Sequence, residues 1–196
     1  MDHPSGAALH EQAAESLAFI RTTMARSASF TAVPGAGGVA MGVVACVAAI
    51  VAARQADGVL WLLTWMLAAT VAAPIGFAAM ARKARRHRVP LWSAAGRRFA
   101  QGFVPAILAG AILTAALVRD GRIDLLPATW LMLYGVGITA GGAASIPLLA
   151  WLGGAFIACG AGAAFTPIWW ADAWLGAGFG GLQILFGIVI ARKHGG

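Results

Sequence analysis

The sequence predicts an all-α membrane protein, a polytopic bundle of about six transmembrane helices preceded by an amphipathic cytoplasmic or interfacial helix. Three observations predict this class. Of the 196 residues, 60% are hydrophobic and only 11% are charged, whereas soluble domains carry about 25% charged residues. The mean hydropathy is +0.80. Several uncharged stretches reach the length of about 20 residues that a helix needs to cross the hydrocarbon core.

Six segments approach or reach that length. They lie at about 34–53, 58–80, 99–118, 125–141, 146–166 and 173–191. The fourth and fifth segments form one apolar block, in which Gly141 to Pro147 is the only plausible turn. Two full spans and a re-entrant pair both remain open for this block.

Residues 1–33 are predicted to form a cytoplasmic amphipathic segment. Apolar residues recur there at roughly helical spacing (Leu9, Leu17, Ile20 and Met24). Charged residues interrupt the stretch, so it does not resemble a signal peptide. We therefore expect a helix that lies on the inner leaflet or docks on the bundle.

The basic residues predict the orientation. Eleven of the fourteen Lys and Arg residues fall on the side that holds both termini, and three fall on the other. The positive-inside rule then places both termini in the cytoplasm of a bacterial inner membrane. The same rule accounts for the net charge of +7 without nucleic acid.

Between the second and third spans, residues 81–98 are predicted to form a basic cytoplasmic loop. We expect its cations to contact lipid headgroups or a partner protein. They are Arg82, Lys83, Arg85, Arg86, Arg88, Arg97 and Arg98.

The tryptophans are concentrated toward the predicted outer face, which holds Trp61, Trp65, Trp130, Trp169, Trp170 and Trp174. This pattern is typical of an aromatic belt at the headgroups. It also allows an outward-facing site for an apolar or cationic small molecule or a lipid, with Arg54, Arg119 and Asp172 at its mouth.

Glycine pairs with G-x-x-x-G spacing predict close helix contacts within the bundle or a dimer seam. They are Gly38 and Gly42, Gly137 and Gly141, and Gly176 and Gly180. Gln183 lies in the last predicted span, where its amide cannot be satisfied locally. We expect it to bond across to another helix or subunit.

The predicted spans contain no acidic, basic or histidine side chain, and such groups carry ion coupling and catalysis within membranes. The chain also lacks the HExxH and GxSxG motifs. We therefore expect no enzyme activity, no metal site and no cofactor.

Residues Glu15 to Arg21, then Thr23-Met24, then Phe30 to Gly35 with Gly37-Gly38, resemble a signature of small polytopic bacterial membrane proteins without assigned activity. The resemblance implies no site residues. In size and helix number the chain is also similar to the substrate-binding components of energy-coupling-factor vitamin transporters, but none of their substrate signatures is present.

Two functions follow as hypotheses. The first is a non-enzymatic membrane protein that acts by association, as an accessory, regulatory or sensing subunit with a protein partner or as a homo-oligomer. The alternative is a substrate-binding or transport component that recognises an apolar or cationic molecule at the outer tryptophans.

Overall fold

The computed structural model describes residues 15–20, 24, 33–88, 90–143 and 145–194, and nearly all of them are helical. Six helical segments in this part of the chain are long and apolar enough to cross a membrane. They contain α2 (Gly35–Ala52), α3 (Gly58–Arg86), α4 (Ala94–Arg119), α5 (Leu126–Gly142) with the short η1 (Ile123–Leu125) before it, α6 (Leu148–Phe165) and a composite last helix of α7 (Ala171–Leu175), η3 (Gly176–Leu182) and α8 (Gln183–His194). The predicted all-α class with six apolar helices is confirmed at this level.

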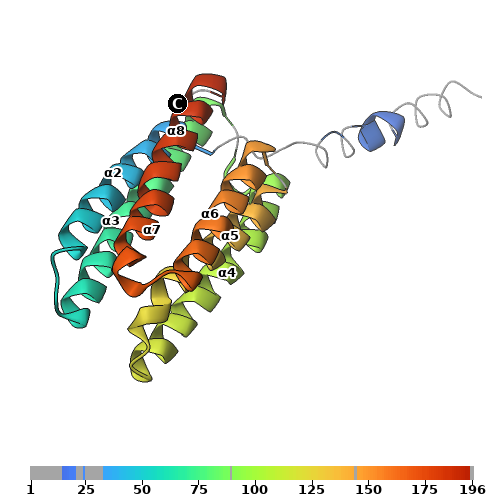
Figure 1. The fold of residues 1–196 in the computed structure, drawn as a ribbon. Helices are drawn as coiled ribbons and strands as arrows, with labels where there is room; N and C mark the ends of the chain where they lie inside the picture. The colour runs from blue at the N-terminus through green and yellow to red at the C-terminus, as the bar shows by residue number, and fades with distance from the viewer. Residues whose placement is uncertain (1–14, 21–23, 25–32, 89, 144, 195–196) are drawn as a thin grey trace, which may run out of the picture.

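The helices form two groups of three (Figure 1). In one group α2 packs against both α3 and the composite helix, and in the other α5 packs against both α4 and α6. The groups meet where α7 and η3 contact α5 and α6. Among the described residues, α3 and α4 make few or no direct contacts with each other, so each is an outer helix.

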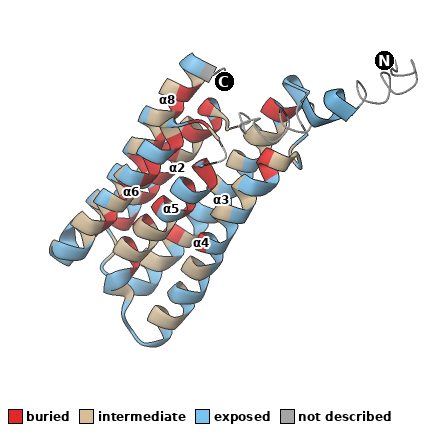
Figure 2. Cartoon of the chain, turned by 90° about the vertical axis from the view of Figure 1, so that its right-hand side faces the viewer, coloured by how far each residue is buried: buried red, intermediate tan, exposed pale blue. Residues whose placement is uncertain are grey.

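Burial follows this arrangement. The largest fully buried side chains belong to α5, α6 and α7: Leu126, Leu131, Leu149, Phe156 and Leu175. Figure 2 shows α3 and α4 mostly in the colours of exposed and intermediate residues. Such apolar but exposed helices are what a bundle surrounded by lipid presents.

The block from 125 to 166 forms two antiparallel helices, α5 and α6, and each belongs to a segment long and apolar enough to cross a membrane. Glycines allow the two backbones to approach closely. A Cβ added to Gly135 would lie 2.7 Å from the carbonyl oxygen of Gly153, and one added to Gly153 would lie 2.6 Å from the oxygen of Gly135. Small residues at such contacts are typical of membrane helices.

The predicted loop 81–98 is largely helical, which corrects its boundaries. Helix α3 continues to Arg86, and α4 already begins at Ala94. Arg and Lys are good helix formers and are favoured at a helix C-terminus, so the basic residues extend α3. Ser93 caps α4, because its Oγ accepts a bond of 3.1 Å from the Gly96 N–H.

The three predicted glycine pairs all lie at helix contacts inside the chain. A Cβ added to Gly42 would contact α8 and η3, at 2.8 Å from the Gly180 oxygen. One added to Gly141 would contact α4, at 2.9 Å from the Phe99 oxygen, and one added to Gly180 would contact α2, at 2.5 Å from Cys46 Sγ. Gly38, Gly137 and Gly176 face the same three neighbours. This arrangement agrees with the contact-face interpretation.

The N-terminal segment 1–33 falls mostly outside the described residues. Within it, Glu15 to Ile20 are helical and exposed. The amphipathic helix expected there therefore stays a prediction.

Candidate functional site

Three tryptophans and one aspartate form a cluster between α3, α5 and α7. Trp61 and Trp65 lie one turn apart on α3, which places them on the same face. Both indole N–H groups donate to Oδ1 of Asp172, over 2.8 Å from Trp61 and 3.1 Å from Trp65. The Trp61 ring stacks on Trp130 of α5, with centroids 5.8 Å apart and planes within 5°. We call Trp61, Trp65, Trp130 and Asp172 the indole cluster.

The third indole of this cluster is also fixed. Trp130 Nε1 donates to Thr114 Oγ1 of α4 over 2.8 Å, and Thr114 in turn donates to the Gly110 carbonyl over 2.7 Å. The indole cluster therefore connects both helix groups, from α3 through α5 to α4.

The remaining residues of the predicted outer site lie elsewhere, which corrects its composition. Trp174 donates to Thr166 Oγ1 over 2.8 Å. Trp169 and Trp170 belong to the short turn η2 (Ile168–Trp170) and are 78% and 51% exposed.

The two predicted cations at the mouth of that site are also absent from it. Arg54 is exposed just after α2. Arg119 is exposed and pairs with Asp120 at 2.9 Å. The structure therefore brings together four of the nine residues predicted for the outer site, namely Trp61, Trp65, Trp130 and Asp172.

A cavity of about 860 Å³ lies between α3 and α4 and borders the indole cluster at one end. Its α3 wall runs from Trp65 to Met80 and its α4 wall from Gly96 to Ala111. At 1.5 Å per residue each wall is about 22 Å long, which is most of a hydrocarbon core of about 30 Å. The volume lies near the top of the range of roughly 300–1,000 Å³ that small-molecule sites occupy.

The cavity is open on one side because α3 and α4 do not pack together. Apolar side chains along its rim are exposed: Phe77 on α3 is 66% exposed, and Val104 and Ile107 on α4 are 46% and 41% exposed. Trp65 and Trp130 line its end nearest the indole cluster. The shape is an elongated slot along the helices, with an apolar opening toward the surroundings of the bundle.

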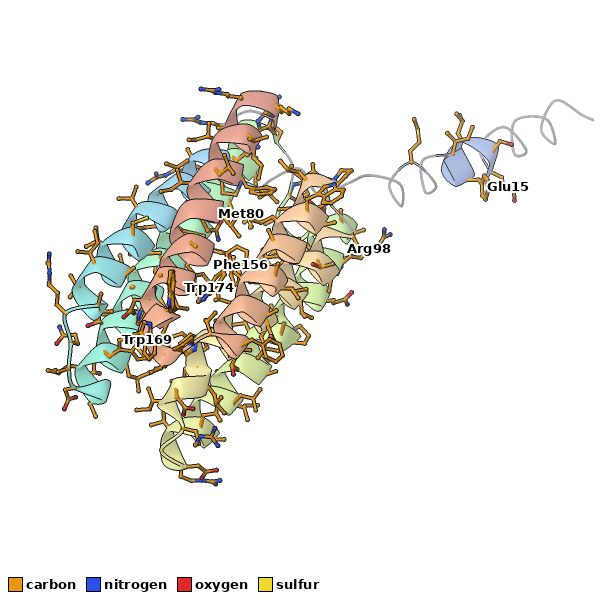
Figure 3. The ribbon with its side chains drawn as sticks, viewed as in Figure 1. Glu15, Met80, Arg98, Phe156, Trp169 and Trp174 are labelled. Carbon is orange, nitrogen blue, oxygen red and sulfur yellow. The ribbon has the colours of Figure 1, made fainter. Side chains whose placement is uncertain are left out.

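Two polar side chains stand at the back of the slot and satisfy each other. Gln183 Nε2 donates to the Tyr134 hydroxyl over 2.6 Å, which supplies the cross-helix partner expected for Gln183. Three phenylalanines surround the Tyr134 ring, with centroids at 4.8 Å (Phe156), 5.1 Å (Phe179) and 5.6 Å (Phe103). Figure 3 places Phe156 between the two helix groups.

The π-helix η3 was not expected from the sequence, although its Gly-rich run GAGFGGL is visible there. Phe179 lies within it and Gln183 follows it directly. π-Helical turns are rare and occur often at functional sites. Here the widened turn supplies Phe179 to the lining of the slot.

At the opposite end of the slot lie the basic residues of α3 and α4. Lys83 is only 3% exposed, and its Nζ donates to the Val33 carbonyl over 3.0 Å. Lys83 is therefore buried, unlike its neighbours, and its contact with lipid headgroups stays a prediction. It continues the face of α3 that carries Met80 toward the interior. The other cations of the predicted loop are exposed: Arg82, Arg85, Arg86, Arg88, Arg97 and Arg98.

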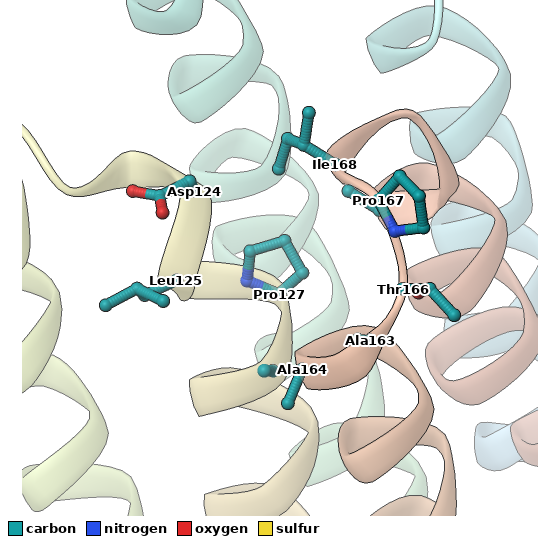
Figure 4. A pocket seen from close by; sticks show the side chains of 10 residues that line it. Asp124, Leu125, Pro127, Ala163, Ala164, Thr166, Pro167 and Ile168 are labelled. Carbon is teal, nitrogen blue, oxygen red and sulfur yellow. The ribbon is translucent and has the colours of Figure 1, made fainter.

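A second, smaller cavity of about 190 Å³ lies at the other end of the bundle (Figure 4). Asp124, Leu125 and Pro127 line one side, and Thr166, Pro167 and Ile168 line the other. Its volume falls below the usual range of ligand sites, which begins at roughly 300 Å³.

Comparison with protein-family models, with curated proteins and with solved structures finds no match to this chain. The resemblance to small bacterial membrane proteins therefore stays a prediction. Among the residues that the structure describes, no group of three or more His, Cys, Asp or Glu side chains could hold a metal ion.

Proposed function

We propose that this chain is a non-enzymatic membrane protein that binds the apolar part of a bilayer molecule in the slot between α3 and α4. The observation that carries the proposal is the slot itself, about 860 Å³ in volume and lined almost throughout by apolar side chains. An apolar cavity of this size favours an apolar occupant, because water there would find few hydrogen-bond partners.

Access from the side supports a ligand that arrives through the bilayer. The rim residues Phe77, Val104 and Ile107 are apolar and exposed, so a hydrocarbon chain can pass between α3 and α4 without crossing a polar surface. The six apolar helices support the bilayer setting, and the side that holds the basic residues is the proposed cytoplasmic one.

The fixed polar groups support recognition of shape rather than of ligand polarity. Gln183 and Tyr134 bond each other, and the Trp65 and Trp130 indoles bond Asp172 and Thr114. With these donors occupied, burial of apolar surface supplies most of the affinity, at about 25 cal/mol per Å².

A photoreactive long-chain alcohol, neutral and apolar, tests the proposal with the protein in lipid discs. We expect labelling on slot residues such as Phe103 and Tyr134. Ala100→Phe places a ring in the slot and should abolish that labelling. Ala115→Phe places the same ring on an exposed position of α4 that does not line the slot, and it should leave the labelling unchanged. Labels confined to outer residues such as Leu108 in the unsubstituted protein would rule the function out.

A second candidate function is association with a partner protein through the basic end of the bundle. The specific observation in its favour is the exposure of the neighbouring cations Arg85, Arg86 and Arg88 at the end of α3. Reversal of Arg85 and Arg86 to Glu should then remove a co-purifying acidic protein, whereas Ala100→Phe should not.

A further inference from the structure

The slot has two chemically different ends. At one end the indole cluster carries the carboxylate of Asp172, and the three other aspartates of residues 33–194 also lie at that end of the bundle. Asp57 precedes α3, Asp120 follows α4 and Asp124 precedes α5. At the other end, the part of the chain from 33 to 194 contributes only cations. Three arginines offset most of the charge at the aspartate end, namely Arg54, Arg119 and Arg122, and the last two pair with Asp120 and Asp124. An anionic group at one end of an occupant therefore meets a positive potential at the basic end and little net charge at the other.

Two cations continue the walls of the slot at its basic end. On α4, the lining residues Ala100, Val104, Ile107 and Ala111 form a stripe at helical spacing, and Arg97 precedes it by one turn. On α3, Lys83 follows the lining residue Met80 by one turn, and its Nζ bonds the carbonyl of Val33, itself a lining residue.

The local backbone adds to the positive potential. Arg97 Nη1 donates to the Trp92 carbonyl over 2.7 Å, which holds the guanidinium beside the lining residues Leu91 and Trp92. The N-terminus of α4 also lies here, and a helix of 26 residues presents a partial positive charge at that end. Trp92 is 75% exposed, as is typical of a tryptophan at a lipid headgroup level.

From this polarity we propose that the slot binds an anionic phospholipid. Its phosphate would lie beside Arg97, within the field of Lys83 and of the α4 N-terminus, and one acyl chain would extend along the slot toward Trp65 and Trp130. This inference rests on the proposed function, and charge complementarity identifies the occupant. The slot length of about 22 Å suits a single long chain whose headgroup lies at the basic end.

Native mass spectrometry of the protein in a neutral maltoside detergent tests this inference. The protein is incubated with equal amounts of phosphatidylglycerol and phosphatidylcholine that carry the same acyl chains. We expect one retained lipid with a preference of at least about fivefold for phosphatidylglycerol, since one Lys or Arg near an anionic headgroup contributes about 1 kcal/mol.

The variants separate the headgroup from the chain. Arg97→Gln should reduce the preference by about fivefold, whereas Arg192→Gln, an exposed arginine of α8 that does not line the slot, should leave it unchanged. Lys83→Gln should act like Arg97→Gln. If burial of Lys83 makes that variant unstable, Arg97→Gln still decides the question.

Three outcomes would overturn the inference. Equal retention of the two lipids, with both lost in Ala100→Phe, would show that the slot binds chains without a preference for charge; the proposed function would then stand. A preference that survives Arg97→Gln would place the anion elsewhere. Retention that Ala100→Phe does not change would contradict both the inference and the proposed function.

Discussion

Asp172 holds the indole cluster together through a single oxygen. Both Trp61 and Trp65 donate to its Oδ1, and Trp65 is only 5% exposed. A buried indole N–H that loses its acceptor destabilises the fold by about 1–3 kcal/mol. The position of two rings at the end of the slot therefore depends on one carboxylate.

Asp172→Ala should loosen both rings, because neither indole keeps its acceptor. We expect a weaker near-ultraviolet circular dichroism signal and a fluorescence emission shifted to the red. Asp172→Asn keeps an acceptor oxygen in the same place and should retain most of the signal. Identical spectra for Asp172→Ala and the unsubstituted protein would contradict the assigned role.

The Gln183–Tyr134 pair makes a second prediction for single residues. Tyr134→Phe leaves the Gln183 amide buried without its partner, at a cost of about 1–3 kcal/mol. Adding Gln183→Leu removes the unpaired amide, so the double variant should recover much of the lost stability. Thermal unfolding in detergent measures the cycle. If the double variant loses as much stability as Tyr134→Phe and Gln183→Leu lose together, the bond contributes nothing.

At the scale of single residues, the sequence predicts that a polar side chain requires a partner, but it does not predict which residue that partner is. That Gln183 requires a partner on another helix follows from its place in an apolar span, but nothing in the sequence identifies Tyr134. The burial of Lys83 could not be predicted because it depends on Val33, which lies 50 residues earlier in the chain. The separation of Trp169 and Trp170 from the indole cluster could not be predicted either, because it depends on the short turn η2.

At the scale of elements, α5 and α6 pack closely through glycines. Added Cβ atoms on Gly135 and Gly153 would lie within 3 Å of the opposite backbone. Only glycine lets the two helices approach this closely, and the tight pair fixes one wall of the bundle against which α4 and η3 pack.

Gly153→Val should therefore separate α5 from α6 and destabilise the protein by several kcal/mol, because overpacking of one contact costs about 1–3 kcal/mol and this site also meets backbone. Gly154 is the matched control, since an added Cβ there meets nothing within 4 Å. Gly154→Val should change the melting temperature in detergent little. Similar losses for both variants would indicate a general effect of helix propensity instead of packing.

The six apolar helices could be predicted at this scale because their hydropathy is high and their ends carry Pro, Gly or charge. The end of α3 and the start of α4 could not be predicted, because basic residues continue a helix beyond an apolar span as readily as they form a loop. The π-helix η3 gave no periodic signal, since its seven residues include four glycines.

At the scale of the whole molecule, the slot arises from the order in which the helices pack. Helices α3 and α4 are consecutive in the chain, yet each packs on its own group (Figure 1), and the slot lies between them. Hydropathy does not encode that order, so the tryptophans at one end of the slot could be predicted from the sequence but the cavity itself could not.

The orientation makes a prediction for the whole molecule in a bacterial membrane. With Cys46 and Cys159 replaced by Ala, single cysteines can be placed at two exposed positions, Ala56 and Arg85. A membrane-impermeant maleimide should label Ala56→Cys in intact cells and Arg85→Cys only after the membrane is opened. The reverse pattern would invert the proposed topology and place the basic end of the slot outside.

The most direct test of the account is a crystal structure grown in a lipid mesophase. It should show α3 and α4 apart, with elongated density in the slot that begins beside Arg97 and ends near Trp130. Direct packing of α3 on α4, with Phe77 and Val104 in contact and no space between Met66 and Leu133, would contradict it.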